Sequence, residues 1–182
     1  TIAVTGGDHS KTVEVKQDPV RSVTIDKSVL QSYYTQMNAN GYNWTTHPPF
    51  DADGTNTASS HGITNVSLSA SPTMTGSYSI QVEKGQKVGT GNYSTQKSYC
   101  SGLNDDGTGW RLPTQIELHA MYKNKAAIEG AGGASLFISF VYWSSSVYGG
   151  NSNNRCILNF NGGNFGYHDT SGNDNVRCVR DI

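Results

Sequence analysis

Apolar and polar positions alternate over several short stretches of the chain, which is the pattern of strands with one buried face. Near the start, this alternation predicts two strands around a turn at Gly6-Gly7-Asp8. A further pair is predicted around Pro72. The predicted strands of the first half are all short: Thr1–Val4, Thr12–Lys16, Val20–Ile25, Val66–Ser69 and Ser77–Val82.

Two segments are predicted as short helices. The first is Asp26–Met37. The second begins at Ser94, whose hydroxyl can accept the amide of Lys97 as an N-cap, and it places Tyr99 and Leu103 one turn apart on one face.

A third helix is predicted from a capping box at Thr114-Gln-Ile-Glu117, in which each end residue satisfies the amide of the other. The apolar residues that follow at helical spacing are expected in the core: Leu118, Met121 and Tyr122. Gly130 and its neighbouring glycines are expected to end the helix near Lys125–Glu129.

The segment Asn38–Gly62 has no periodicity and is predicted as a loop. It holds Tyr42, Trp44 and Phe50, and three aromatic rings are rarely left exposed together. We therefore expect a long ordered loop that packs on its own rings.

Alternation returns near the C-terminus. Cys156, Leu158 and Phe160 alternate with more polar positions, and an Asn161-Gly-Gly turn leads into a predicted return strand that contains Phe165. This hairpin would bury the row Cys156, Leu158, Phe160 and Phe165. It would display the opposite row: Arg155, Ile157, Asn159 and Asn161.

The composition of this region is unusual. Ser144–Asn175 holds eight of the sixteen Asn in the chain, with six Gly, five Ser and only three charged residues. Asn, Ser, Gly and Tyr are the residues of antibody-like binding loops, because Tyr gives rigid contact area and the small polar residues give adaptable hydrogen bonds. A solvated, turn-rich β surface would have the same composition, so both interpretations stay open at this point.

A coding regularity favours the binding interpretation. Residues 144–182 contain no Lys, Glu, Gln, Met or Trp, although the preceding 143 residues contain 25 of them. These five types cannot be reached by changing only the two adenines of an AAC or AAT asparagine codon. An Asn-rich template altered at adenines would leave this signature, although a Gly/Ser/Asn-rich β region would also deplete some of these residues.

Length and charge exclude several classes. A chain of 182 residues is expected to form one domain, or one domain and a fragment. Charged residues are 15%, the net charge is −1 and no basic cluster occurs, so nucleic acid is not an expected partner. The longest apolar run, Leu136–Trp143, is too short for a membrane span. The start at Thr1 suggests a mature fragment of a longer protein.

Candidate chemistry is sparse. His47 and His61 lack metal-ligand spacing, and Asp51, Asp53 and Asp105-Asp106 are weak candidates for calcium, so no metal or cofactor is predicted. The run Ser144–Ser146 has no His or Asp partner at a catalytic spacing, and we interpret it as a hydrogen-bonding element of a strand. Arg111 is expected to be buried and to bond backbone carbonyls.

Several motifs together carry a family resemblance. They are Tyr99-Cys100, Gly109-Trp-Arg-Leu-Pro-Thr114, Glu117-Leu118, Tyr142-Trp-Ser-Ser-Ser146, Leu158-Asn-Phe160 and Val176-Arg-Cys-Val-Arg180. In this order they resemble the C-type-lectin-like domains of bacterial surface proteins, and most closely the variable proteins of diversity-generating retroelements. There, a reverse transcriptase copies a template with adenine-directed errors into the end of the gene. The resemblance covers residues 85–182 well and residues 20–84 by position.

The resemblance implies an α+β C-type-lectin-like domain over residues 20–182, with two helices, a small twisted antiparallel sheet and a variable ligand-binding region at about 144–175. Residues 1–19 lie outside it and are expected to form a hairpin or the tail of a preceding β-sandwich. It also implies that Trp143, Leu158, Phe160 and Val176–Arg180 belong to the scaffold. Three cysteines allow three pairings, and the resemblance favours Cys100–Cys178, with Cys156 left as a buried thiol.

We therefore expect an extracellular binding domain and not an enzyme. In similar proteins such domains are carried on pilus tips, outer-membrane lipoproteins or phage tail fibres, which implies a Gram-negative cell surface or a phage fibre. The expected partner is a protein or glycan on another surface, and the N-terminal segment could join pilus or surface-protein subunits. The alternatives are an enzyme like those that generate formylglycine, which share this fold, and a structural pilin subunit.

The predicted ligand-binding residues lie in the variable region. They are expected to converge on one exposed patch, with Tyr148 and Tyr167 as aromatic anchors. The full set is Tyr148, Asn151, Asn153, Asn154, Arg155, Ile157, Asn159, Asn161, Asn164, Tyr167, His168, Asp169, Asn173 and Asp174. The enzyme alternative would place the site instead in the loop Asn38–Gly62.

Overall fold

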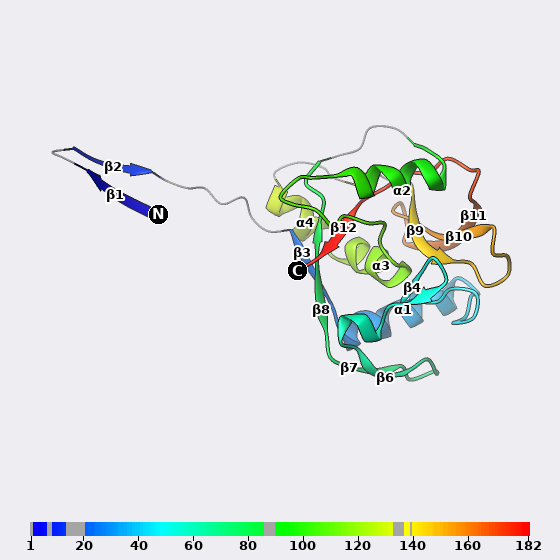
Figure 1. Ribbon diagram of the computed structural model, residues 1–182. Helices are drawn as coiled ribbons and strands as arrows, with labels where there is room; N and C mark the ends of the chain where they lie inside the picture. The colour runs from blue at the N-terminus through cyan, green and yellow to red at the C-terminus, as the bar shows by residue number, and fades with distance from the viewer. Residues whose placement is uncertain (1, 7–8, 14–20, 86–89, 133–136, 139) are drawn as a thin grey trace.

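Among the residues that the structure describes, two three-stranded antiparallel sheets and four α-helices are the main elements (Figure 1). The computed structural model describes residues 2–6, 9–13, 21–85, 90–132, 137–138 and 140–182. One sheet has the order β11-β10-β9, from Asn164–Asp169, Asn154–Asn159 and Val141–Val147. The other has the order β12-β8-β3, from Val179–Asp181, Tyr78–Val82 and Ser22–Ile25.

The remaining strands pair two by two. β1 (Ile2–Gly6) pairs with β2 (His9–Val13), so a hairpin is present around the predicted turn, with a second strand that begins three residues earlier than predicted. Residues 1 and 14–20 lie outside the described part. β4 (Asp51–Ala52) pairs with β5 (Thr55–Asn56) inside the predicted loop, followed by a 3-10 turn at Ser59–His61.

The predicted pairing around Pro72 is wrong. β6 (Thr64–Ser67) pairs with β7 (Thr73–Thr75), whereas β8 lies between β3 and β12. Alternation tells which face of a strand is buried but not which strand is its partner. Ile80 and Val82 are fully buried, and a central position in the second sheet provides that burial.

The first two helices begin directly after residues whose side chains cap them. α1 (Lys27–Ala39) begins after Asp26, whose carboxylate accepts the amide of Val29 at 3.0 Å. α2 (Tyr93–Gly102) is capped by Asn92, not by Ser94: the Asn92 side chain accepts the amide of Thr95 at 2.9 Å. Asn is at least as good a cap as Ser, and the N-cap lies two residues earlier than predicted.

α3 (Gln115–Lys123) begins at the predicted capping box, where the Glu117 carboxylate accepts the amide of Thr114 at 2.8 Å. It ends at Asn124, and a separate helix α4 (Lys125–Gly132) follows, so the prediction that glycine ends the helix near Lys125–Glu129 is wrong. Gly disfavours a helix by only about 1 kcal/mol, and the burial of Ile128 from α4 can override that preference.

The sheet of β9, β10 and β11 is covered on both faces. Leu158, Phe160 and Phe165 join one apolar core with α1 and α3. Ile157 and Trp143 join a second core near α2. Ile157 is therefore buried and not displayed as predicted, because the outer face of β10 carries its own cluster of side chains.

A disulfide fixes the second core. Cys100 of α2 and Cys178, next to β12, are joined with their Cα atoms 5.5 Å apart, which is the pairing that the family resemblance implied. Cys156 is a buried free thiol. The pairing ties the helix before the Gly109–Thr114 motif to the last strand of the chain.

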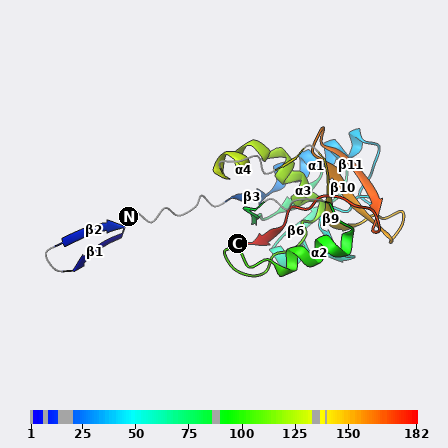
Figure 2. The same ribbon diagram turned by 90° about the horizontal axis from the view of Figure 1, so that it is seen from above.

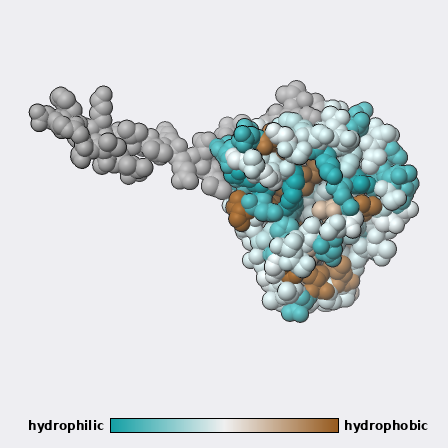
Figure 3. Space-filling model, in the orientation of Figure 1, coloured by the Kyte–Doolittle hydropathy of each residue, from teal (hydrophilic) through white to brown (hydrophobic). Residues whose placement is uncertain are grey.

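The loop between β9 and β10 lies at the end of the domain opposite the C-terminus in both ribbon views (Figures 1 and 2). On the face shown in Figure 3, apolar residues form small separate patches on a mostly hydrophilic or neutral surface. Among the described residues, no helix combines the length and apolar composition that a membrane span requires.

Candidate ligand-binding site

The strand register separates the predicted site residues onto two faces of one sheet. In the β10–β11 pair, Cys156 lies opposite Tyr167, and Arg155 lies opposite His168. Paired residues point to the same face and neighbours along a strand to opposite faces. Tyr167 therefore projects on the side of α1, while Arg155 and His168 project on the side of α2, so the residues do not form one patch.

An aromatic cluster occupies the first of these faces. The rings of Tyr148 and Tyr167 stack with centroids 3.9 Å apart and planes 14° apart. The ring centroid of His47 lies 5.6 Å from that of Tyr148, in an edge-to-face arrangement, and 4.0 Å from that of Tyr42. Tyr167 is 41% exposed, and Tyr148 and Tyr42 are half-buried. We call Tyr42, His47, Tyr148 and Tyr167 the aromatic end of the domain.

Buried His47 holds this cluster to the sheet. Its Nε2 lies 3.0 Å from the carbonyl oxygen of Gly166, so Nε2 carries the hydrogen and donates a hydrogen bond to β11. Burial lowers the pKa of His47 to about 4, and the imidazole is neutral at pH 7. Sequence reasoning placed His47 and Tyr42 in the competing site. The structure brings both next to Tyr148.

The loop after β9 packs tightly on the segment that carries His47. The amide of Gly149 donates to the carbonyl oxygen of Thr46 at 3.1 Å. A Cβ at Gly149 would lie only 1.8 Å from the carbonyl oxygen of Thr45, so a larger residue does not fit there. Asn151, which caps the following turn with bonds to Asn153 and Asn154, is exposed.

Arg155, on the other face, is held by the protein itself. Its guanidinium lies 3.3 Å from the Asp53 carboxylate and 4.6 Å from the centroid of the Tyr93 ring. Asp53 also accepts the Tyr93 hydroxyl at 2.5 Å and pairs with Lys97 at 3.0 Å. Burial alone would raise the pKa of Asp53, but these partners together lower it, so Asp53 is an anion at pH 7. Arg155 therefore joins the β4–β5 turn to the sheet.

His168 also contacts a carboxylate of the protein, that of Asp174. Its Nδ1 lies 2.6 Å from a carboxylate oxygen of Asp174, and its ring contacts the edge of Trp143. Asp174, which was predicted on the surface, is buried, because its backbone forms a bridge with Gly91 on both sides. His168 itself remains exposed.

The asparagines of the tract lie mostly at the surface. Asn154 and Asn159 are half-buried, and Asn175 is buried. The exposed members are Asn151, Asn153, Asn161, Asn164 and Asn173, together with the neighbouring Asp169. Asp169 is engaged with Ser171, which donates from its amide and its hydroxyl at 2.8 Å and 2.7 Å.

The serine run forms hydrogen bonds within the fold, as the sequence predicted. Ser144, Ser145 and Ser146 are buried, and their hydroxyls donate to the carbonyl oxygens of Cys156, Pro113 and Asp51 at 2.7, 3.1 and 2.8 Å. The three hydroxyls thus join β9 to a neighbouring strand, to the loop before α3 and to β4. The Gly109–Thr114 motif and the serine run therefore contact each other where β9 packs on the loop before α3.

A comparison with protein families decides the class of this arrangement. Residues 38–180 match the Lcl C-terminal domain. The chain belongs to this family.

Lcl C-terminal domains have a C-type-lectin-like fold, and the mixed α+β architecture with small antiparallel sheets agrees with it. The match gives the chain the general class of a ligand-binding, adhesin-type domain. It begins near the end of α1, although Leu30 and Tyr33 of that helix are fully buried in the same core. A search of curated proteins finds no match to the chain.

One cluster in this Lcl-type domain has the donor types of a metal site. His61, Glu117 and Asp181 place ligand atoms within 4.8 Å of one another. Arg111 already pairs with both carboxylates, at 2.7 Å to Glu117 and 2.6 Å to Asp181, and donates to one backbone carbonyl, that of Leu112, at 3.3 Å. It is half-buried, so the expectation of a buried arginine that bridges backbone carbonyls is corrected to one that bridges two carboxylates. The charge that a cation would need is neutralised by this guanidinium, which favours a structural ion-pair network.

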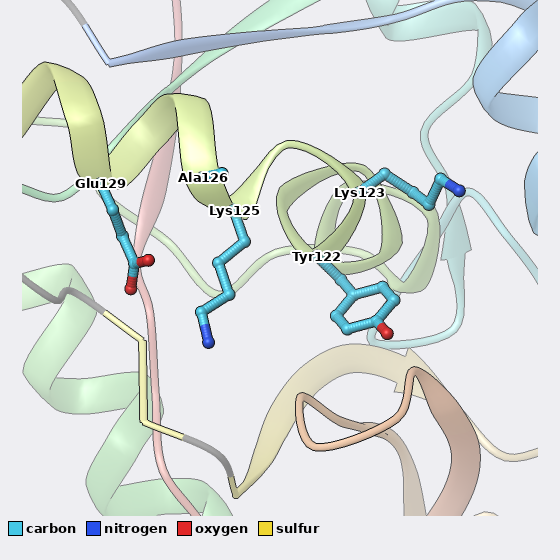
Figure 4. A pocket seen from close by; sticks show the side chains of 5 residues that line it. All are labelled: Tyr122, Lys123, Lys125, Ala126 and Glu129. Carbon is cyan, nitrogen blue, oxygen red and sulfur yellow. The ribbon is translucent and has the colours of Figure 1, made fainter.

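The carboxylates that were weak candidates for calcium have protein partners as well. Asp51 accepts the amides of Gly54 and Val147, and Asp106 pairs with Lys84 at 2.7 Å. A separate open pocket of about 460 Å³ lies along α3 and α4, where Tyr122 and Lys125 project into it beside the β10–β11 turn (Figure 4). Its remaining lining is Lys123, Ala126 and Glu129, a set of surface side chains that does not enclose a ligand.

Proposed function

We propose that this domain is an extracellular binding module that presents its aromatic end to a receptor or surface. The observation that carries the proposal is the stacked pair Tyr148 and Tyr167, seated on Tyr42 and His47. Half-exposed tyrosines fixed in orientation by packing are the usual anchors of binding surfaces, because little side-chain entropy is lost on binding. This end points away from the C-terminus, so a chain attached there would leave it accessible (Figure 1).

The binding face draws on fixed and variable segments together. Tyr148 and Tyr167 belong to the Asn-rich tract, whereas Tyr42 and His47 belong to the loop after α1. The expectation of a site wholly within residues 144–175 is therefore extended here to include Tyr42. The two sites that the sequence treated as alternatives are neighbouring parts of one surface.

We further infer that the tract is a diversified region of the retroelement type. Most of its asparagines are exposed, and substitutions at exposed positions usually change stability by less than about 0.5 kcal/mol. The buried Ser144–Ser146 precede them, the buried Cys156–Leu158 lie among them, and both runs maintain the sheet. Diversification by adenine-directed errors requires a surface that tolerates substitutions and a scaffold that stays unchanged beneath it.

The proposed location is the surface of a Gram-negative bacterium, on a pilus or an outer-membrane anchor, with a phage tail fibre as the alternative. The Cys100–Cys178 disulfide supports an oxidising compartment. The partner would be a protein or glycan on another surface, and the β1–β2 hairpin would serve contacts with other subunits. A non-enzymatic role is supported by the serine run, whose hydroxyls are all donated to carbonyl oxygens.

The test is a binding screen of the purified domain against immobilised glycans and purified surface proteins. A variant with Tyr148→Ser and Tyr167→Ser should lose the binding that the unmodified domain shows, while Leu68→Ser, at an exposed site elsewhere, should keep it. Equal binding by both folded variants would contradict the proposed face. A reverse-transcriptase gene beside a near-copy of the tract, differing mainly at adenines, would support the retroelement origin, and its absence would remove that part alone.

A further inference from the structure

A second cavity lies away from the aromatic end. It has a volume of about 370 Å³, and Ile138, Phe140 and Val141 provide its apolar lining. Phe140 is 63% exposed, an unusual state for a phenylalanine, so one wall of the cavity is a ring with an open face. Val141 begins β9 and Tyr148 follows its end, which separates this cavity from the aromatic end by about 20 Å along the strand.

The polar part of the lining contains one acidic group. Asp174 lines the cavity between Asn173 and Asn175, and its side chain is more than nine-tenths buried. His168 occupies one carboxylate oxygen, with its Nδ1 at 2.6 Å. A carboxylate can accept about four hydrogen bonds, so Asp174, which lines the cavity, retains acceptor capacity beyond its bond to His168.

The backbone around Asp174 is fixed. Its amide and carbonyl both bond Gly91, and the side chain of Gln96 donates to the same carbonyl oxygen at 2.9 Å. Asn175 donates from its side chain to the carbonyl oxygen of Val141 at 3.0 Å. The carboxylate and the apolar wall are thus held in one geometry before any ligand arrives, which lowers the entropy lost on binding.

We propose that this cavity binds an aliphatic cation, such as the side chain of a lysine on a partner protein. A methylene stem would lie against Ile138 and Val141, and the ammonium would pair with Asp174. The exposed face of Phe140 would add attraction to the cation, because the face of an aromatic ring is electronegative. A buried carboxylate in an apolar cavity favours a cationic ligand over a neutral one of the same shape, since the neutral ligand leaves the charge without a new partner.

The experiment is a titration of the ¹⁵N-labelled domain by NMR with n-pentylammonium and, in parallel, with n-pentanol. The ammonium should shift the amide signals of Asn173, Asp174 and Asn175, and the alcohol should bind roughly tenfold more weakly. Asp174→Asn keeps the shape of the side chain and should weaken ammonium binding by a similar factor. Asp169→Asn, an exposed carboxylate of the same segment, should leave the affinity unchanged.

Equal affinity for the two ligands, or an unchanged affinity in folded Asp174→Asn, would overturn the proposal. So would ammonium shifts that fall outside the cavity. If Asp174→Asn does not fold, Phe140→Ala decides, because it removes only an exposed ring: weakening by roughly threefold supports the site and an unchanged affinity contradicts it. The outcome is independent of the aromatic end, whose variants leave this cavity intact.

Discussion

Arg155 and Asp53 form an ion pair that joins the Asn-rich tract to the β4–β5 turn, with 3.3 Å between guanidinium and carboxylate. The pair also includes the Tyr93 ring beneath the guanidinium and Lys97 beside the carboxylate. A side chain held in this way is unavailable as a flexible ligand-binding arm. It acts as part of the scaffold, although it lies within the tract that the sequence marks as variable.

Arg155→Ala is therefore expected to lower the free energy of unfolding by about 1–2 kcal/mol, from the lost charge-assisted bonds and the lost contact with Tyr93. Arg155→Lys should recover part of this, because it keeps the charge without the planar fork. Chemical denaturation of the three proteins measures the difference. Identical stabilities would show that the pair contributes nothing to the fold.

Scaffold and display positions should differ strongly in the free energy of unfolding. Trp143→Ala or Phe160→Ala should cost about 3–5 kcal/mol, because each leaves a cavity in one of the two cores. Asn153→Ser or Asn173→Ser should change it by less than about 0.5 kcal/mol. Thermal melts of the four variants suffice, and equal losses in both groups would place the asparagines in the core.

Gly149 is predicted to be fixed within the variable tract. Gly149→Ala would place a Cβ against the carbonyl of Thr45 and should cost about 1–3 kcal/mol, because both segments must move apart. Gly102→Ala is the matched control, since a Cβ there meets open space. The same displacement should disturb the stack of Tyr148 on Tyr167, so Gly149→Ala should also weaken any binding by the aromatic end.

The sequence predicted the parts of this fold whose cause is local. Asp26 begins a helix because its carboxylate accepts the amide of Val29, and Thr114 begins one because the Glu117 carboxylate accepts the amide of Thr114. The row from Cys156 to Phe165 is buried because its period matches a strand. The burial of Ile157 depends on a second core near α2, and no local sequence pattern indicates that core. The division of Tyr167 from His168 depended on the register of β10 and β11.

The part of the candidate site that the sequence missed was the contribution of the loop after α1. Tyr42 and His47 reach Tyr148 through the docking of Gly149 on Thr45 and Thr46, a contact between segments about a hundred residues apart. One signal did exist. Three aromatic residues in an aperiodic loop had to pack against something, and the tyrosines of the tract were among the aromatic residues without an assigned core.

The cysteines give a chemical prediction. Reduction of Cys100–Cys178 should destabilise the domain by about 4 kcal/mol, the loop-closure entropy of a cross-link that spans 78 residues. Burial raises the pKa of the Cys156 thiol, so it should resist alkylation by iodoacetamide until the protein unfolds. A non-reducing peptide map that shows Cys156 in a disulfide would contradict both statements.

Two buried histidines predict the response to acid. Burial lowers the pKa of His47 and of His119 to about 4, from an ordinary value of 6.5. Above pH 6.5 both are neutral in the folded and the unfolded chain and contribute no pH dependence. Between pH 6.5 and pH 4 these two histidines are protonated in the unfolded chain but neutral in the folded chain. The free energy of unfolding should therefore fall as the pH falls, by up to about 3 kcal/mol for each residue.

His61 acts with the opposite sign. Its bond to Asp181 raises its pKa, so it stabilises the folded state in acid and loses that contribution as the pH rises through the raised pKa. Urea denaturation at pH 7.5 and pH 4.5 should therefore show a loss of stability in acid that His47→Gln reduces, because Gln does not titrate and can still donate to Gly166. His61→Gln should make the same loss larger. If His47→Gln left the acid loss unchanged, the neutral imidazole could not be what holds the aromatic end on the sheet.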